Sequence, residues 1–404
     1  MSRSEEKPRR SPGRLDTRLR ADLEGAAASH PRVAARYHWV LRHRWPLLAV
    51  AGILRALSDG VDPIVTQDLY SFSEAGTDLL AGRWSEVYAH PQVQTGPLHL
   101  ALFGLNRVLS DSLGFPLQAG ITVGVTLGLL AAAVYVLRRL CAATGRTPTP
   151  GFELFFGLVI VFGGFAYEGA TSAHPTEGFI PLLWLLAGVR AREDKAVRAG
   201  LLLALASVLK PWGILGLPLL LITSDLRRAL KGALVCGVVS ATAYAPFLLA
   251  APSGGGSLGF SWSVAHHAPI RLLLDPDTTF TWWMRVAQGA VCGGAGIFVA
   301  WRARRDERAV WSVPLAIMAV RLLSDPLDYH YYWLSPGLVG LIAACTVVTF
   351  RPTWVRVPLA ASFAVTLMPF YVVSGAARAM WIGLLALGVL VVAGFSLRRP
   401  PTAG

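Results

Sequence analysis

Charged side chains are scarce in this sequence, since Asp, Glu, Lys and Arg together make up only 15% of its 404 residues. A soluble domain carries about 25%. Hydrophobic residues account for 54% of the chain, and its mean hydropathy is +0.50. The few charges cluster between long apolar runs, which excludes a soluble domain and indicates an integral membrane protein.

Cysteine is also scarce. The four cysteines lack the spacing of metal ligands, so we interpret them as small buried apolar residues. They are Cys141, Cys236, Cys292 and Cys345. The N-terminus lacks the apolar core of a cleavable signal peptide. Residues 1–44 are polar and rich in Arg, which predicts a partly disordered cytoplasmic tail with a helix on the membrane surface at 31–44.

Thirteen apolar segments follow this tail. They cover residues 45–57, 97–111, 116–137, 152–167, 179–189, 199–209, 211–223, 231–250, 285–301, 309–322, 331–349, 355–373 and 379–397. Short basic loops separate many of them, as is typical of the cytoplasmic side of a membrane protein. The net charge of +13 therefore reflects the orientation of the chain in the membrane, and we expect no nucleic-acid partner.

The number of spans follows from the position of the basic loops. Thirteen crossings would place the two basic termini on opposite sides of the membrane. The weakest segment is 97–111, because it carries His99, Asn106 and Arg107. If this segment is re-entrant or interfacial, twelve spans remain, and every basic loop lies in the cytoplasm.

The expected fold is therefore all-α, a polytopic transmembrane bundle of about twelve spans in the plasma membrane. It covers residues 45–397, and the tails at 1–44 and 398–404 are cytoplasmic. No internal repeat of fixed period is visible. Four polar regions are expected on the extracytoplasmic face, and they are 58–96, 168–178, 251–284 and 323–330.

The first outer loop, 58–96, contains a second amphipathic pattern. Apolar residues recur with near-helical spacing between Tyr70 and Leu80, which predicts a helix lying along the membrane surface. Asp68 stands just before this pattern. Its carboxylate can either cap the helix or act as a general base at the membrane face.

Two further stretches place ionisable side chains among apolar residues. In YEGATSAHPTEG, which carries Glu168, His174 and Glu177, proline and glycine break the helix, and such a break tends to line a cavity. Lys210 lies within the apolar run LALASVLKPWGILGLPLLL. It can extend to the membrane interface, or it can face a cavity and hold an anion.

The last two outer regions combine charges with aromatic residues. Residues 251–284 contain the pair His266 and His267, which would diverge by about 100° on a helix and so do not favour a two-histidine metal site. Arg271 in the same region suits a phosphate. The region 323–330 includes Asp325, Asp328, Tyr329 and His330. A divalent metal between Asp62, Asp68 and Asp325 is possible, but no spacing demands one.

Three of these stretches together resemble a known group of enzymes. The first is Asp68, Tyr70, Phe72, Ala75, Gly76, Leu79, Gly82 and Tyr88, followed by Gly96 and Pro97. The second is the alanine-rich run that ends in Lys210 and a proline, and the third is SDPLDYHYYWLSPG. In this order they are similar to the GT-C superfamily of membrane glycosyltransferases, and most to the bacterial polyprenyl-phosphate-mannose-dependent mannosyltransferases. TGP replaces the usual aromatic-Pro-Pro turn, HPTEG stands where the family often has Gly-Gln, and Tyr331 replaces a second histidine.

The resemblance implies an inverting transfer of a sugar, with mannose as the default, on the extracytoplasmic face. The donor would be a polyprenyl-phosphate sugar, and the acceptor a glycolipid or glycan of the envelope. Asp68 would be the catalytic base, and Lys210, His330 and Arg271 would bind the donor phosphate. Residues expected to line the substrate are His174, Glu177, His267, Asp325, Asp328 and Tyr329. No cofactor is implied.

Two other functions fit the same composition. A transporter or flippase of a lipid-linked or small polar solute would also have many spans and intramembrane charges. The long first outer loop favours the enzyme, and the lack of a visible inverted repeat disfavours common transporters. A non-catalytic scaffold or a degenerate member of the family is the third alternative, and it is favoured if Asp68 is dispensable.

Overall fold

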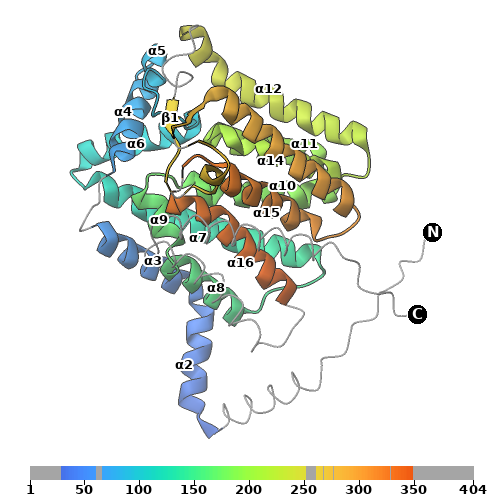
Figure 1. Ribbon diagram of the computed structural model, residues 1–404. Helices are drawn as coiled ribbons and strands as arrows, with labels where there is room; N and C mark the ends of the chain where they lie inside the picture. The colour runs from blue at the N-terminus through green and yellow to red at the C-terminus, as the bar shows by residue number, and fades with distance from the viewer. Residues whose placement is uncertain are drawn as a thin grey trace, which may run out of the picture.

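The computed structural model describes residues 29–60, 66–251, 261–266, 268–275, 277–327 and 329–348. Within these ranges the protein is all-α apart from a small antiparallel hairpin (Figure 1). The hairpin pairs β1 (Ser261–Ser263) with β2 (Thr279–Thr281), and Trp262 lies opposite Phe280. The all-α class expected from the sequence is confirmed.

The helices follow one another with short connections. In chain order they are α2 (Pro31–Arg42), α3 (Arg44–Gly60), α4 (Gln67–Leu80), α5 (Trp84–Val87), α6 (Pro97–Leu113), α7 (Leu117–Ala143), α8 (Pro150–Phe162), α9 (Phe165–Thr171), α10 (Thr176–Arg192), α11 (Ala196–Leu209), η1 (Pro211–Ile222), α12 (Leu226–Ala250), η2 (Pro269–Leu272), α14 (Trp282–Ala303), α15 (Ala309–Ser324), η3 (His330–Trp333) and α16 (Leu334–Val348).

Three helical stretches of the described residues are long and apolar enough to cross a membrane. They are Leu117–Ala143, Pro150–Thr171 and Leu226–Ala250. Shorter apolar helices occupy Ala196–Leu209, Pro211–Ile222 and Ala309–Ser324. The structure thus supports a membrane protein with three candidate spans, not the twelve expected. The predicted spans 355–373 and 379–397 and the tail 398–404 lie outside the described residues, as do residues 1–28 of the N-terminal tail.

Several local predictions can be compared with the helices. The surface helices expected at 31–44 and 70–80 correspond to α2 and α4. Asp68 does not cap α4, because it is the second residue of that helix and Thr66 is the N-cap. The break expected from Pro175 to Gly178 is shorter than predicted, because α10 already starts at Thr176 and includes Gly178.

Helix α10 lies at the centre of the main hydrophobic core. It packs against α7, α11, η1, α15 and α16. Trp184 on α10 is completely buried, and its indole Nε1 donates a hydrogen bond to the carbonyl oxygen of Gly213 in η1 at 2.8 Å. Because η1 contains Pro211 and Pro218, it lacks two backbone donors and does not continue the α-helix of α11. The expected span at 211–223 is therefore a short 3₁₀ segment held against α10.

Helices α4 and α6 form a second, smaller core with α7. The helices cross at Gly76 and Gly104, where a Cβ on either residue would overlap the backbone of the other helix. The loop after α5 ends at Gly96, whose N–H donates to the carbonyl oxygen of Leu209 at 3.0 Å. This contact fixes the end of the loop directly beside Lys210.

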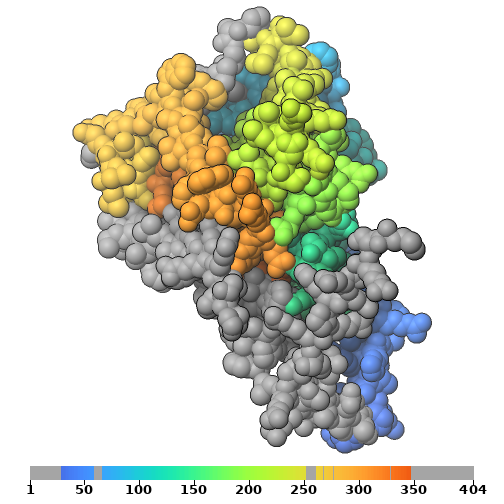
Figure 2. Space-filling view, turned by 90° about the vertical axis from the view of Figure 1, so that its right-hand side faces the viewer, coloured from blue at the N-terminus to red at the C-terminus, as the bar shows by residue number. Residues whose placement is uncertain are grey.

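The outer surfaces of α12 and α14 are strongly apolar. Figure 2 shows both helices on one face of the molecule. Their exposed large side chains include Leu230, Leu234, Val238, Leu249, Val291, Ile297, Phe298 and Trp301. A surface of this kind suits contact with lipid rather than with water.

Candidate functional site

A cavity of about 1190 Å³ lies where α4, η1, α12, the hairpin, α14 and the end of α15 meet. Its polar and aromatic lining includes Asp68, His174, Lys210, Trp212, Trp262, Arg285, Gln288, Arg321, Tyr329, Tyr331 and Tyr332. Apolar side chains of η1, α12 and α14, such as Leu215, Phe247 and Val286, also line the cavity. The cavity thus has both charged and apolar lining residues. The three cations Lys210, Arg285 and Arg321 are called the charged wall below, and the apolar residues are called the apolar wall.

Asp68 and His174 form the first polar contact of the site. The Nε2 atom of His174 lies 3.0 Å from Oδ2 of Asp68, although the two residues are 106 positions apart in sequence. Asp68 projects from the first turn of α4, and its side chain is 40% exposed. His174 is buried in the turn between α9 and α10, stacked on Tyr331 at 4.2 Å. The carboxylate is thus oriented by a buried imidazole and still open to the cavity.

The imidazole of His174 is neutral at physiological pH. Burial, and then the nearby charge of Lys210, lowers its pKa from 6.5 to about 4. Its Nδ1 atom lies 3.3 Å from the Nζ atom of Lys210. An ammonium can only donate, so Nδ1 accepts from Lys210, and the remaining ring proton on Nε2 is donated to Asp68.

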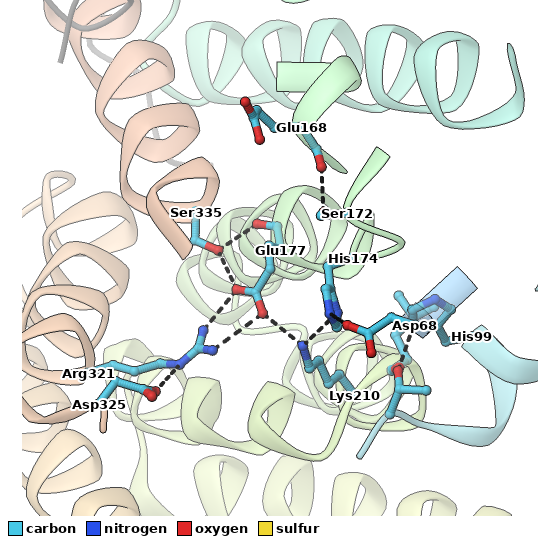
Figure 3. Close-up of polar contacts among 12 residues, drawn as sticks. Asp68, His99, Glu168, Ser172, His174, Glu177, Lys210, Arg321, Asp325 and Ser335 are labelled. Atoms are coloured by element: carbon cyan, nitrogen blue, oxygen red, sulfur yellow. Dashed lines mark hydrogen bonds and ion pairs between the residues drawn. The ribbon is translucent and has the colours of Figure 1, made fainter. Parts of the chain in front are cut away.

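Lys210 extends this row of hydrogen bonds from His174 to a buried carboxylate (Figure 3). Its Nζ atom lies 3.0 Å from Oε1 of Glu177, which has no exposed side-chain surface. The guanidinium of Arg321 contacts both carboxylate oxygens, with Nη1 at 2.9 Å from Oε2 and Nη2 at 3.3 Å from Oε1. The hydroxyl of Ser335 donates to the backbone oxygen of Glu177 at 2.5 Å. Two cations on the cavity wall are therefore held by one carboxylate behind it.

A second carboxylate holds the other end of the charged wall. Oδ2 of Asp325 accepts from Nη1 of Arg285 at 3.0 Å and lies 3.8 Å from Nε of Arg321. Gln288 accepts from the same Nη1 atom of Arg285 at 2.6 Å. The guanidinium of Arg321 also lies 4.3 Å from the ring of Trp212 and 4.6 Å from that of Tyr332. Both arginines are fixed in position before any ligand binds.

The structure brings six of the predicted site residues into this assembly. They are Asp68, His174, Glu177, Lys210, Asp325 and Tyr329. Glu177 and Asp325 were expected to line the substrate, but they are 0% and 1% exposed and lie behind the cations. His267 and Asp328 lie outside the described residues.

Two predicted phosphate ligands are placed elsewhere. His330 pairs with Glu168, with Nε2 at 2.7 Å from Oε2, and is not among the residues that line the cavity. Arg271 donates to the backbone oxygen of Val264 at 3.3 Å and is also absent from the lining. Arg271 lies in η2 and His330 begins η3, and neither is part of the charged wall.

Sequence reasoning missed Arg285 and Gln288, and it did not include Arg321 among the site residues. Arg285 sits at the start of an apolar helix directly after Trp282, Trp283 and Met284, where it looks like an interfacial anchor. The available signal was an i, i+3 spacing that places Arg285 and Gln288 on one helix face. Among the described residues, no group of three or more His, Cys, Asp or Glu side chains is placed to hold a metal ion.

Fold and site together define a helical protein with candidate membrane spans and a cavity that has one charged and one apolar wall. No family model matches this chain, and neither a curated protein nor a solved structure matches it.

Proposed function

We propose that this protein is an inverting glycosyltransferase of GT-C type, which moves a sugar from a polyprenyl-phosphate donor to an envelope glycolipid or glycan. The observation that carries this proposal is the cavity, in which one open carboxylate, that of Asp68, lies beside a set of fixed cations and is linked to Lys210 through His174. Transfer from a lipid-phosphate sugar requires a base, cations for the phosphate and an apolar surface for the lipid, and the residues that line this cavity are suited to these three tasks.

The base would be Asp68. In the proposed reaction the acceptor hydroxyl oxygen attacks the anomeric carbon, and Asp68 takes the hydroxyl proton. The bond between the anomeric carbon and the phosphate oxygen breaks, and its electron pair leaves on the phosphate. His174 donates to Oδ2 of Asp68, and no partner within the described residues occupies Oδ1, so one oxygen is fixed and the other is available. A placed base of this kind contributes about 10²–10⁴-fold.

The cations would stabilise the departing phosphate. Lys210, Arg285 and Arg321 all line the cavity and are held by hydrogen bonds before the substrate arrives. Donors fixed in advance need no reorganisation as charge develops, which is the main source of electrostatic catalysis. The leaving group is already a stable phosphate, so an acid that protonates it is not required.

We also propose that the chain is a multi-pass protein of the plasma membrane, with both termini in the cytoplasm and the cavity on the extracytoplasmic face. The apolar cavity wall beside α12 and α14 supports a lipid substrate, because the outer surfaces of these helices are themselves apolar. The prenyl chain would then remain in the lipid phase while its phosphate reaches the charged wall.

One observation also favours the transporter alternative. The buried pairs of Glu177 with Lys210 and Arg321 join different helices, and such pairs are common on solute pathways. A transporter needs no open carboxylate that is oriented for proton transfer, so replacing Asp68 separates the two functions.

The test is sugar transfer by the purified full-length protein, from a radiolabelled polyprenyl-phosphate mannose to an envelope lipid extract. Asp68→Asn is expected to lower the rate by about 10²–10⁴-fold with folding unchanged. Glu74→Gln is the matched control, because Glu74 is an exposed carboxylate on the same helix. Full activity in Asp68→Asn would refute the assignment of the base, and solute uptake without transfer would favour the transporter.

A further inference from the structure

Arg285 differs from the other two cations of the cavity because some of its N–H donors remain available to a ligand. Its Nη1 atom is engaged by Asp325 and Gln288. Within the described part of the chain, its Nε and Nη2 atoms have no hydrogen-bond partner. Its side chain is 26% exposed, and its guanidinium lies 5.2 Å from the ring centroid of Phe280.

Lys210 and Arg321 are more buried, and more of their donors are engaged by protein partners. Their side chains are each only 11% exposed. Both terminal nitrogens of Arg321 contact Glu177, and its Nε faces Asp325. The ammonium of Lys210 is shared between Glu177 and His174. These two cations can attract an anion, but neither presents a free planar edge.

The charges around the cavity are close to balanced. Lys210, Arg285 and Arg321 stand in front of two buried carboxylates, Glu177 and Asp325. Asp68 supplies a third carboxylate, on the other side of the neutral His174 from Lys210. An anionic ligand would therefore be bound through specific hydrogen bonds to a cation rather than through an excess of positive charge.

We infer that Arg285 is the residue that binds the phosphate of the donor, through the pair of N–H groups on Nε and Nη2. This edge of a guanidinium matches two oxygens of a phosphate. The inference rests on the proposed function, and it assigns the phosphate contact to a residue that none of the sequence motifs includes. Arg285 belongs to the charged wall, and the next residue of α14, Val286, is one of the apolar residues that line the same cavity, so a phosphate at the end of a prenyl chain could reach Arg285.

The test measures lipid binding rather than transfer. A C55 polyprenyl phosphate and the matching C55 polyprenol are titrated into the purified full-length protein in detergent, and tryptophan fluorescence reports binding, because Trp212, Trp262 and Trp282 line the cavity. The wild-type protein is expected to prefer the phosphate by about 10- to 100-fold, the range for hydrogen bonds to a charged group. Arg285→Gln is expected to abolish that preference and to leave polyprenol binding unchanged.

Three further variants make the result decisive. Arg285→Lys keeps the charge but loses the planar edge, so it should retain only part of the preference. Arg285→Gln combined with Asp325→Asn removes the buried carboxylate that the single variant leaves unpaired, and it carries the test if the single variant unfolds. Arg302→Gln is the matched control, because Arg302 is exposed at the far end of α14; its phosphate preference should equal that of the wild type.

The possible outcomes separate this inference from the proposed function. Full phosphate preference in Arg285→Gln or in the double variant overturns the role of Arg285, whatever the transfer assay gives. Preference that depends on Arg285 in a protein without transfer activity supports the phosphate site and refutes the enzyme. A wild-type protein without any preference refutes both. Displacement of the bound lipid by excess inorganic phosphate would assign the site to a free anion and overturn the proposal.

Discussion

Glu177 illustrates how single residues set up the site. Its carboxylate is completely buried, which is costly for an ionised group unless it is paired and hydrogen-bonded. Lys210, Arg321 and Ser335 supply that pairing. Removing one partner of such a buried group typically costs about 3–5 kcal/mol. Glu177 therefore acts through the two cations, whose positions on the cavity wall depend on it.

His174 should make the stability of the protein depend on pH. Its pKa is about 4 in the folded protein and about 6.5 in the unfolded chain. Between these values the unfolded chain binds a proton that the folded protein does not, so stability falls as pH falls from about 6.5 to about 4 and is constant above that range. The loss is on the order of 3 kcal/mol. His174→Gln should remove this part of the acid destabilisation.

Thermal unfolding of the purified protein in detergent, followed from pH 4 to pH 8, measures this effect. The difference in Tm between wild type and His174→Gln should shrink or reverse on the acid side. His38→Gln serves as the control, because His38 is exposed on α2. Parallel pH profiles for wild type and His174→Gln would contradict a neutral buried His174.

At this scale the sequence identifies the residues but not their partners. Lys210 is singled out because it lies in an apolar run, Asp68 because it precedes a predicted surface helix, and His174 because it lies at a predicted helix break. Their contacts join positions 106 and 36 apart in sequence, and no local pattern encodes such pairs. Arg285 was missed for the opposite reason, since an arginine after two tryptophans is what a membrane-interface anchor also requires.

Among the elements, α4 has the most direct effect on the site, because it carries Asp68. Its position depends on the crossing with α6, where Gly76 and Gly104 let the two backbones touch. Any side chain at either position would force the helices apart. Since Asp68 lies two turns before Gly76 on α4, a shift at the crossing would also move the base away from His174.

Gly76→Ala is therefore expected to destabilise the protein by about 1–3 kcal/mol, the usual cost of overpacking, and to reduce sugar transfer more than lipid binding. The matched control is Gly124→Ala on α7, where an added Cβ meets nothing within 4 Å. That change should be neutral or stabilising, because alanine favours a helix by up to about 1 kcal/mol over glycine. Equal effects of the two substitutions on Tm and activity would contradict the close crossing.

Hydrophobic periodicity predicted most of the elements but not their lengths. The surface helix at 70–80 was found because its apolar residues repeat with helical spacing, and it corresponds to α4. The run at 211–223 looked like a span because its composition is apolar, yet its prolines and glycines favour the short η1 segment. Composition alone does not distinguish a helix that crosses the bilayer from one that packs inside the bundle.

For the molecule as a whole, the cavity and the basic connections between helices lie at opposite ends of α11, α12 and α14. Lys210 ends α11, and the start of that helix carries Arg198. Arg285 begins α14, which ends near Arg302. The end of α12 lines the cavity, and its start carries Arg227 and Arg228. If the basic ends are cytoplasmic, as the positive-inside rule requires, the cavity faces the extracytoplasmic side.

Single cysteines at the two ends test this orientation in intact cells. Ser263→Cys places a thiol on the exposed edge of the cavity, and Arg304→Cys places one on the exposed turn after α14. The four native cysteines are buried and should react little. A membrane-impermeant maleimide should label position 263 from outside and position 304 only after the membrane is opened. The reverse pattern would put the cavity on the cytoplasmic side, where the charged wall would meet a different pool of substrates. Labelling of both positions from one side would contradict a bundle that crosses the membrane between them.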